Sequence, residues 1–262
     1  MIKEGSRMSL SFLHGCSVER LNNVIKIVSM KPTKETEEVM FRNINTLLSP
    51  KPIALEAGIS RLENGMLHIA MRNVLHHCKG KMLDWWFKYF ETTADLKLWH
   101  PHDHVEHGGW DSKWIKYENY IGATIHATES LGDIPPVQAT IKFHDPADIF
   151  NVDVLKQAYA DGSVSAVVYA RIGFGENTPV DHNGDPIDGY MFHVVRDTVQ
   201  GCTLRSHFYL GALMADRENQ LSDEVGFGLM EHCYSEFTYL AQVLPSLYYA
   251  ENKNGDKAPF LW

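Results

Sequence analysis

The 262-residue chain has only four cysteines, and no two of them form a Cys-x-x-Cys pair. Neither a cysteine zinc site nor a disulfide framework is therefore expected. No run of about 18 apolar residues occurs, and the first residues lack the apolar stretch of a signal peptide. We expect a cytoplasmic protein with no membrane partner.

The chain also lacks a basic cluster. Its 24 Lys and Arg residues are outnumbered by 33 Asp and Glu residues, which gives a net charge of −9. This balance argues against a nucleic-acid partner. Six Trp, eleven Tyr and twelve Phe are enough to line a pocket for a small aromatic molecule, although protein cores use the same residues.

Near the end of the chain, His232 and Glu236 lie four residues apart in a segment of helical periodicity. Such residues share one helix face. The helix is apolar on both sides, so it is expected to be buried, and a buried carboxylate needs a partner. A divalent metal would satisfy both residues, but ordinary hydrogen bonds or an opening to water would also do so.

Two other segments carry metal-ligand residue types. His100, His102, Asp103 and His104 follow an aromatic stretch, and Pro101 indicates a turn or extended segment there. A strand over 120–129 alternates so that Glu129 continues the apolar face of Ile121, Ala123, Ile125 and Ala127. The alternative to a ligand role for the histidine segment is a solvated loop. The alternative for Glu129 is that the strand ends before it and its side chain reaches water.

The remaining pattern predicts an α+β fold. Asn64-Gly65 between apolar runs predicts a hairpin over 58–71, and Met82–Phe90 predicts a helix whose Trp86 lies in the core or lines a ligand cavity. Strand-like runs at 137–143, 164–173, 190–196 and 202–210 predict an antiparallel meander. A long helix is expected to begin near Ser222 and to end or kink at Pro245.

These elements suggest a helix-grip arrangement, in which strands wrap a long C-terminal helix around an internal cavity. We expect a small N-terminal extension over 1–54 and the main domain over 55–262. His193 shares a face with Met191 and Val195, a setting that by itself favours a core histidine over a catalyst. Arg205, His207 and Tyr209 share one face of the next run.

Four side chains from distant segments form a plausible set of zinc or iron ligands: one histidine of the 100–104 segment, Glu129, His232 and Glu236. Zinc is preferred to ferrous iron. Three separate segments each present a metal-ligand side chain toward the interior. Without a metal, each of these side chains would need a hydrogen-bond partner of its own.

The segments 82–87, 98–104, 121–129 and 232–237 resemble, in their order, the 2,4-diacetylphloroglucinol hydrolase and phloretin hydrolase family. The resemblance spans residues 55–245. It implies a Bet v 1-like helix-grip fold and zinc-dependent hydrolysis of the carbon–carbon bond next to an aryl ketone. The implied residues are the metal ligands His100, Glu129, His232 and Glu236, with His104 as the alternative to His100, and the acid/base His193. Asp103 and Tyr209 are the implied substrate partners, and Trp86 is expected beside them; a homodimer is also expected.

Two other functions remain open. One is a helix-grip protein that binds an aromatic ligand without a metal. The other is a non-haem iron oxygenase that uses two histidines and one carboxylate.

Overall fold

The computed structural model describes residues 43–212 and 220–252. The segment at 18–30, which has helical spacing, and most of the expected extension over 1–54 lie outside these residues, so that domain boundary stays a prediction. No helix within the described ranges is long and apolar enough to cross a membrane.

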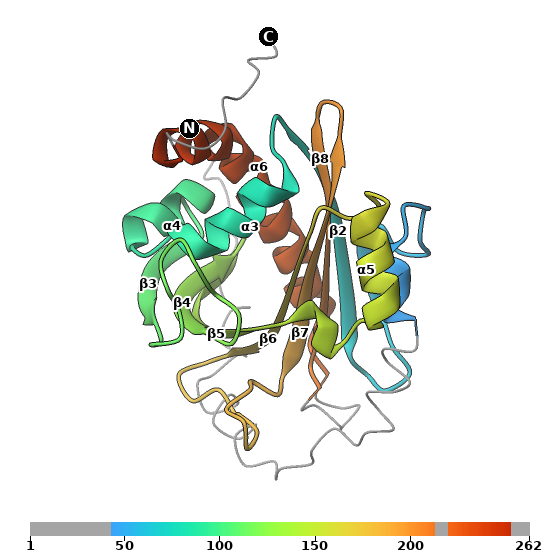
Figure 1. The fold of residues 1–262 in the computed structure, drawn as a ribbon. Helices are drawn as coiled ribbons and strands as arrows, with labels where there is room; N and C mark the ends of the chain where they lie inside the picture. The colour runs from blue at the N-terminus through green and yellow to red at the C-terminus, as the bar shows by residue number, and fades with distance from the viewer. Residues whose placement is uncertain (1–42, 213–219, 253–262) are drawn as a thin grey trace, which may run out of the picture. The chain divides into compact units, whose positions relative to one another are not determined.

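Eight antiparallel strands form one curved sheet in the order β1-β2-β8-β7-β6-β5-β4-β3 (Figure 1). The strands are β1 (Gly58–Arg61), β2 (Leu67–His76), β3 (His104–Trp110), β4 (Thr124–Leu131), β5 (Ile134–His144), β6 (Ala166–Phe174), β7 (Gly189–Thr198) and β8 (Gly201–Leu210). The predicted hairpin and meander are confirmed. Gly65, at φ 87°, supplies the left-handed residue that the β1–β2 turn requires.

The long helix α6 (Asp223–Glu251) packs on the inner face of this sheet, as Figure 1 shows. Two shorter helices, α3 (Gly80–Tyr89) and α4 (Thr93–Trp99), lie beside it. Gly226 and Gly228 let α6 approach the sheet closely, since a Cβ on Gly228 would lie 2.7 Å from the carbonyl oxygen of Leu131. The α+β helix-grip architecture is confirmed.

Of the two alternatives expected at Pro245, an end or a kink, the end is excluded, because α6 continues for six residues beyond Pro245 to Glu251. A proline in a helix leaves the carbonyl four residues earlier without its partner. That carbonyl belongs to Ala241, and it accepts a hydrogen bond from the Cys78 thiol at 3.8 Å. The lost helical bond is thus replaced from another part of the fold.

The sheet separates two apolar cores. The inner core lies between the sheet, α3, α4 and α6. The outer core is covered by the 3-10 helix η1 (Ile44–Leu48) and by α5 (Val152–Ala160), with the short 3-10 turn η2 (Pro146–Asp148) just before α5. Successive residues of a strand face opposite cores, and this alternation decides which side chains reach the candidate site.

Candidate active site

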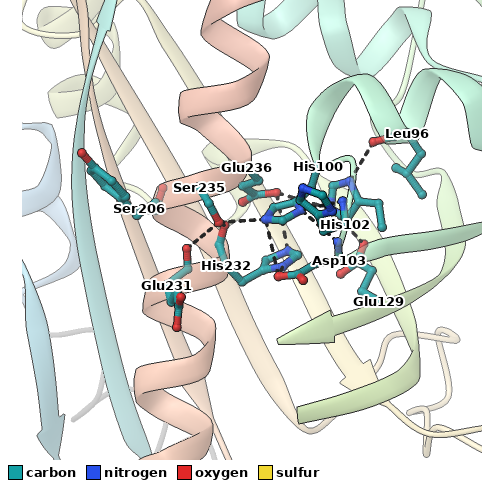
Figure 2. A network of polar contacts seen from close by, with 12 residues as sticks. Leu96, His100, His102, Asp103, Glu129, Ser206, Glu231, His232, Ser235 and Glu236 are labelled. Atoms are coloured by element: carbon teal, nitrogen blue, oxygen red, sulfur yellow. Dashed lines mark hydrogen bonds and ion pairs between the residues drawn. The ribbon is translucent and has the colours of Figure 1, made fainter. Parts of the chain in front are cut away.

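His104, Glu129, His232 and Glu236 converge between the sheet and α6. His104 begins β3 and is the direct cross-strand partner of Glu129 on β4, so the two side chains lie side by side. His232 and Glu236 lie one turn apart on α6. Figure 2 shows Glu129, from the sheet, pointing toward His232 and Glu236 of the helix.

The distances within this group are similar. Nε2 of His104 lies 3.7 Å from Oε1 of Glu129 and 3.6 Å from Oε2 of Glu236. Nε2 of His232 lies 3.7 Å from the same oxygen of Glu236. Zinc bonds of about 2.0–2.1 Å in tetrahedral geometry would separate neighbouring ligand atoms by about 3.4 Å. The ligand atoms of His104, His232 and Glu236 all lie within 4.8 Å of one another, so these three residues could hold a zinc ion, with Glu129 beside His104.

The hydrogen bonds at Nδ1 of His104 and of His232 determine that the Nε2 atoms of these rings face the carboxylates. Nδ1 of His104 donates to the Leu96 carbonyl at 2.8 Å, and Nδ1 of His232 donates to Oδ2 of Asp103 at 3.1 Å. In the neutral rings, both Nε2 atoms then carry lone pairs that point toward carboxylate oxygens. Lone pairs facing anionic oxygens repel one another, so the arrangement requires a cation or a proton between them.

The electrostatic setting supports the same conclusion. Burial raises the pKa of Glu236 to about 8 and lowers the pKa of His104 to about 3. Burial also acts to lower the pKa of His232. The hydrogen bond to Asp103 and the carboxylates of Glu236 and Glu129 outweigh it, and that pKa rises to about 9. Protons therefore occupy the group when no metal does.

His100, expected as the first ligand, does not join this group, and His104 takes the place beside Glu129 and Glu236. Nδ1 of His100 accepts the backbone N–H groups of His102 at 3.3 Å and Asp103 at 2.9 Å. Nε2 therefore carries the proton; it lies 2.8 Å from Oγ of Ser235 and 3.4 Å from Oδ2 of Asp103. His100, Asp103 and His232 do cluster, but hydrogen bonds already use both nitrogens of His100.

A cavity opens beside the four donors, and Glu129, His232 and Glu236 form part of its wall. His193 of β7 also lines it. Aromatic side chains supply much of the remaining wall: Phe87, Phe90, Trp99, Phe143, Phe174 and Phe208. The site is thus a small group of ionisable residues within an apolar, largely aromatic chamber.

His193 is only 2 % exposed, and its Nδ1 lies 2.8 Å from Oγ of Ser206, which leaves Nε2 for a ligand. Burial lowers the pKa of His193 to about 3, so the ring is neutral at pH 7. The structure therefore places this predicted acid/base residue in the cavity as a neutral imidazole.

The three expected substrate contacts lie elsewhere. Tyr209 faces the outer core, where its ring stacks on His68 at 4.3 Å. Trp86 is fully buried and is not among the residues that line the cavity; its ring stacks on Phe90 at 5.5 Å. Asp103 supports His232 rather than the chamber.

One aromatic residue of the cavity, Phe208, was not anticipated. Strand alternation was the available signal for Phe208. Tyr209 shares a face of its strand with Arg205, so the neighbouring Phe208 must lie on the other face.

A family model described as the DAPG hydrolase PhiG domain matches residues 39–249. The chain belongs to this family. Among relatives in the DAPG hydrolase family, 2,4-diacetylphloroglucinol hydrolase of Pseudomonas protegens is 28% identical over 240 residues, which are 82% of this chain and 75% of that protein. Phloretin hydrolase of Eubacterium ramulus is 26% identical over 193 residues, which are 67% of this chain and 64% of that protein.

Solved structures similar to this DAPG hydrolase family member include Ara h 8.0201, with 9% identity, a TM-score of 0.42 and coverage of 72% of this chain and 99% of that one. Norcoclaurine synthase from Thalictrum flavum gives 10% identity, a TM-score of 0.36 and coverage of 78% and 100%. The predicted family is confirmed by the family model, and the roles of individual residues stay predictions.

Proposed function

We propose that the protein is a zinc-dependent hydrolase that cleaves the bond between an acyl group and a hydroxylated aromatic ring. Membership of the DAPG hydrolase family and the names of its relatives support the reaction class. The observation that carries the proposal is the group of His104, His232 and Glu236, whose candidate ligand atoms lie within 4.8 Å of one another, with Glu129 3.7 Å from His104. Glu129, His232 and Glu236 of this set also line the aromatic cavity.

His104, Glu129, His232 and Glu236 are the residues that would hold the metal. They offer two imidazole nitrogens and two carboxylates, a donor set that suits zinc. When bound, zinc supplies Lewis acidity toward a carbonyl oxygen and lowers the pKa of water. His104 and His232 are fixed for this role by the hydrogen bonds at their Nδ1 atoms.

The reaction adds water across a carbon–carbon bond. The ring carbon gains a hydrogen and the acyl carbon gains the hydroxyl, so the products are a phenol and a carboxylic acid. An aryl carbanion is a poor leaving group, but hydroxyls flanking the acyl group let the ring take up a proton first and become a β-diketone. Substrates that lack such hydroxyls would therefore not be cleaved.

His193 is the residue we assign to the proton transfer. Because its pKa is far below 7, it acts from the neutral form. Its free Nε2 would take a proton from a flanking hydroxyl and release it to the ring carbon that bears the acyl group. Ser206 holds Nδ1 and so orients the ring toward the cavity.

His193→Ala tests this assignment. We expect the variant to keep its zinc and to lose turnover by about 10²-fold or more, because general acid–base groups typically contribute 10²–10⁴-fold. Release of carboxylic acid and phenol from acylphloroglucinols and dihydrochalcones, identified by mass, is the assay. Full turnover by the variant would remove His193 from the mechanism. Product formation that consumes oxygen in wild-type protein would contradict the hydrolase itself.

A further inference from the structure

The hydrogen bond between Ser206 and His193 can run in either direction, and the direction decides where the His193 proton lies. The two residues are direct partners across β7 and β8, with Nδ1 of His193 2.8 Å from Oγ of Ser206. A serine hydroxyl has one proton to donate and two lone pairs that accept. If Ser206 accepts from Nδ1–H, Nε2 of His193 keeps the lone pair that the proposed proton transfer needs. If Ser206 donates to Nδ1, the His193 proton lies on Nε2 instead.

The direction depends on where else the Ser206 proton can go. β8 lies between β2 and β7, so the backbone groups on both sides of Ser206 pair within the sheet. A second side chain that hydrogen-bonds to Ser206 is Cys233 of α6. The ring of Phe237, one turn further along α6, lies 5.0 Å from the ring of His193, so this part of the helix packs over the same pair of strands. The sulfur of Cys233 is therefore an acceptor for the Ser206 proton.

Cys233 is in turn directed by Glu236. The two residues lie three apart on one face of α6, and the thiol hydrogen-bonds to the carboxylate. A carboxylate that holds a metal is ionised and only accepts, so the single proton of the thiol points toward Glu236. The sulfur lone pairs then accept from Ser206, and Oγ of Ser206 accepts Nδ1–H of His193. Ser206 is drawn in the same network of polar contacts as Glu236 in Figure 2.

Solvent does not replace these partners, because His193, Ser206, Cys233 and Glu236 are all buried. A hydrogen bond that is lost within such a series is not remade with bulk water. Removing one member therefore leaves the next one free to reverse its direction.

We infer, on the basis of the proposed function, that Ser206 and Cys233 are positioning residues for His193. Cys233 connects the candidate ligand Glu236 to Ser206, and Ser206 keeps the His193 proton on Nδ1. The lone pair of Nε2 is then available in the cavity before a substrate binds. One face of α6 thus supplies a metal ligand and also holds the proton-transfer residue in its reactive tautomer.

Nitrogen NMR of protein labelled with ¹⁵N-histidine, with zinc added, reads this tautomer directly, because protonated and unprotonated ring nitrogens have well-separated shifts. The signals of His193 are those that disappear in His193→Gln. We expect wild type to carry the proton on Nδ1. In Cys233→Ala the Ser206 proton loses its acceptor, so we expect a mixture of both tautomers or the Nε2–H form.

Cys233→Ser is the matched control, because its hydroxyl can donate and accept as the thiol does, and we expect it to keep the wild-type tautomer. The Nε2–H form in wild type, or an unchanged Nδ1–H form in Cys233→Ala, would overturn the inference.

Kinetics at saturating zinc provide a second measurement. We expect Cys233→Ala to lower kcat about tenfold with KM nearly unchanged, which is less than the loss from removing His193, because part of the population keeps the reactive tautomer. Cys233→Ser should recover most of this kcat. Equal losses in the two variants, or a loss in KM alone, would contradict a role that acts through His193.

The NMR measurement keeps this inference distinct from the proposed function. A wild-type protein that cleaves no acylated phenol, but shows the expected tautomers in all three proteins, would reject the hydrolase and leave the hydrogen-bonded series standing. Cleavage with the same tautomer in wild type and Cys233→Ala would do the reverse.

Discussion

At the scale of single residues, Asp103 has the clearest consequence for the candidate metal centre. Its Oδ2 accepts Nδ1–H of His232 at 3.1 Å and lies 3.4 Å from both Nε2 of His100 and the backbone N of Gly132. This contact keeps the His232 proton on the nitrogen that points away from Glu236. Asp103 is thus a positioning residue for a ligand, in the manner of carboxylates behind metal-bound histidines.

Asp103→Ala removes the acceptor and frees His232 to carry its proton on Nε2. We expect zinc affinity to fall about 10–100-fold, as for other residues behind metal ligands. Asp103→Asn keeps a carbonyl oxygen at the same position and should lose less. Competition with a chromogenic chelator gives both dissociation constants. A folded Asp103→Ala protein with unchanged zinc affinity would show that His232 needs no such support.

Spacing alone does not distinguish His100 from His104 as the candidate first ligand. His100 and His104 are both buried and both close to His232, with ring centroids 5.2 Å apart in each case. They differ in which nitrogen keeps a lone pair. The tight turn after α4 directs two backbone N–H groups at Nδ1 of His100, and the Leu96 carbonyl takes the Nδ1 proton of His104.

At the scale of elements, local patterns predicted most of the fold. Asn64-Gly65 located the first hairpin, and alternation located the buried strands and the inward Glu129. The sequence left open whether α6 ends or continues with a kink at Pro245, because the carbonyl that the proline leaves free is bound by Cys78, more than 160 residues away in the chain. The family resemblance implied a substrate contact for Tyr209, but this residue lies in the outer core.

Gly228 tests the close packing of α6 on the sheet. Alanine favours helices by about 1 kcal/mol over glycine, but its Cβ would lie 2.7 Å from the Leu131 backbone oxygen. We expect Gly228→Ala to lower the free energy of unfolding by about 1–3 kcal/mol in urea denaturation.

Gly226→Ala is the matched control, because its Cβ would meet only the side chains of Ile59 at 2.9 Å and Leu67 at 3.0 Å. These side chains can shift, so the loss should be smaller. Stabilisation by Gly228→Ala, or a larger loss from Gly226→Ala, would mean that α6 is not held as closely to β4 as described.

At the scale of the whole molecule, both faces of the sheet bury neutral histidines. Burial lowers the pKa of His193 on the inner face to about 3, and on the outer face it lowers the pKa of His68 to about 4. His207, which contacts His68 at 2.9 Å, has its pKa lowered to about 3, first by burial and then by its charged neighbours. Folding therefore opposes protonation at three sites.

This burial predicts acid sensitivity. The pKa of each histidine is about 6.5 in the unfolded chain, so between about pH 6.5 and 4 the unfolded chain binds protons that the folded chain does not. The free energy of unfolding should therefore fall as the pH falls through this range, by up to about 1.4 kcal/mol per pH unit for each such histidine. Above pH 7 these residues contribute no pH dependence.

His68→Gln removes one of these contributions, and it also removes the charge of His68 that helps to lower the pKa of His207. In urea unfolding between pH 6.5 and 5, we expect the variant to lose stability less steeply than wild type by about 1 kcal/mol per pH unit. Parallel curves would mean that His68 is protonated in the folded protein.

Zinc content of protein purified without added metal tests the central claim most directly. Elemental analysis of wild type, His100→Ala and His104→Ala compares two buried histidines four residues apart, only one of which has a lone pair free for a metal. We expect about one zinc per chain in wild type and in His100→Ala, and almost none in a folded His104→Ala protein. Full zinc content in His104→Ala, or none in wild type, would contradict the metal centre described here.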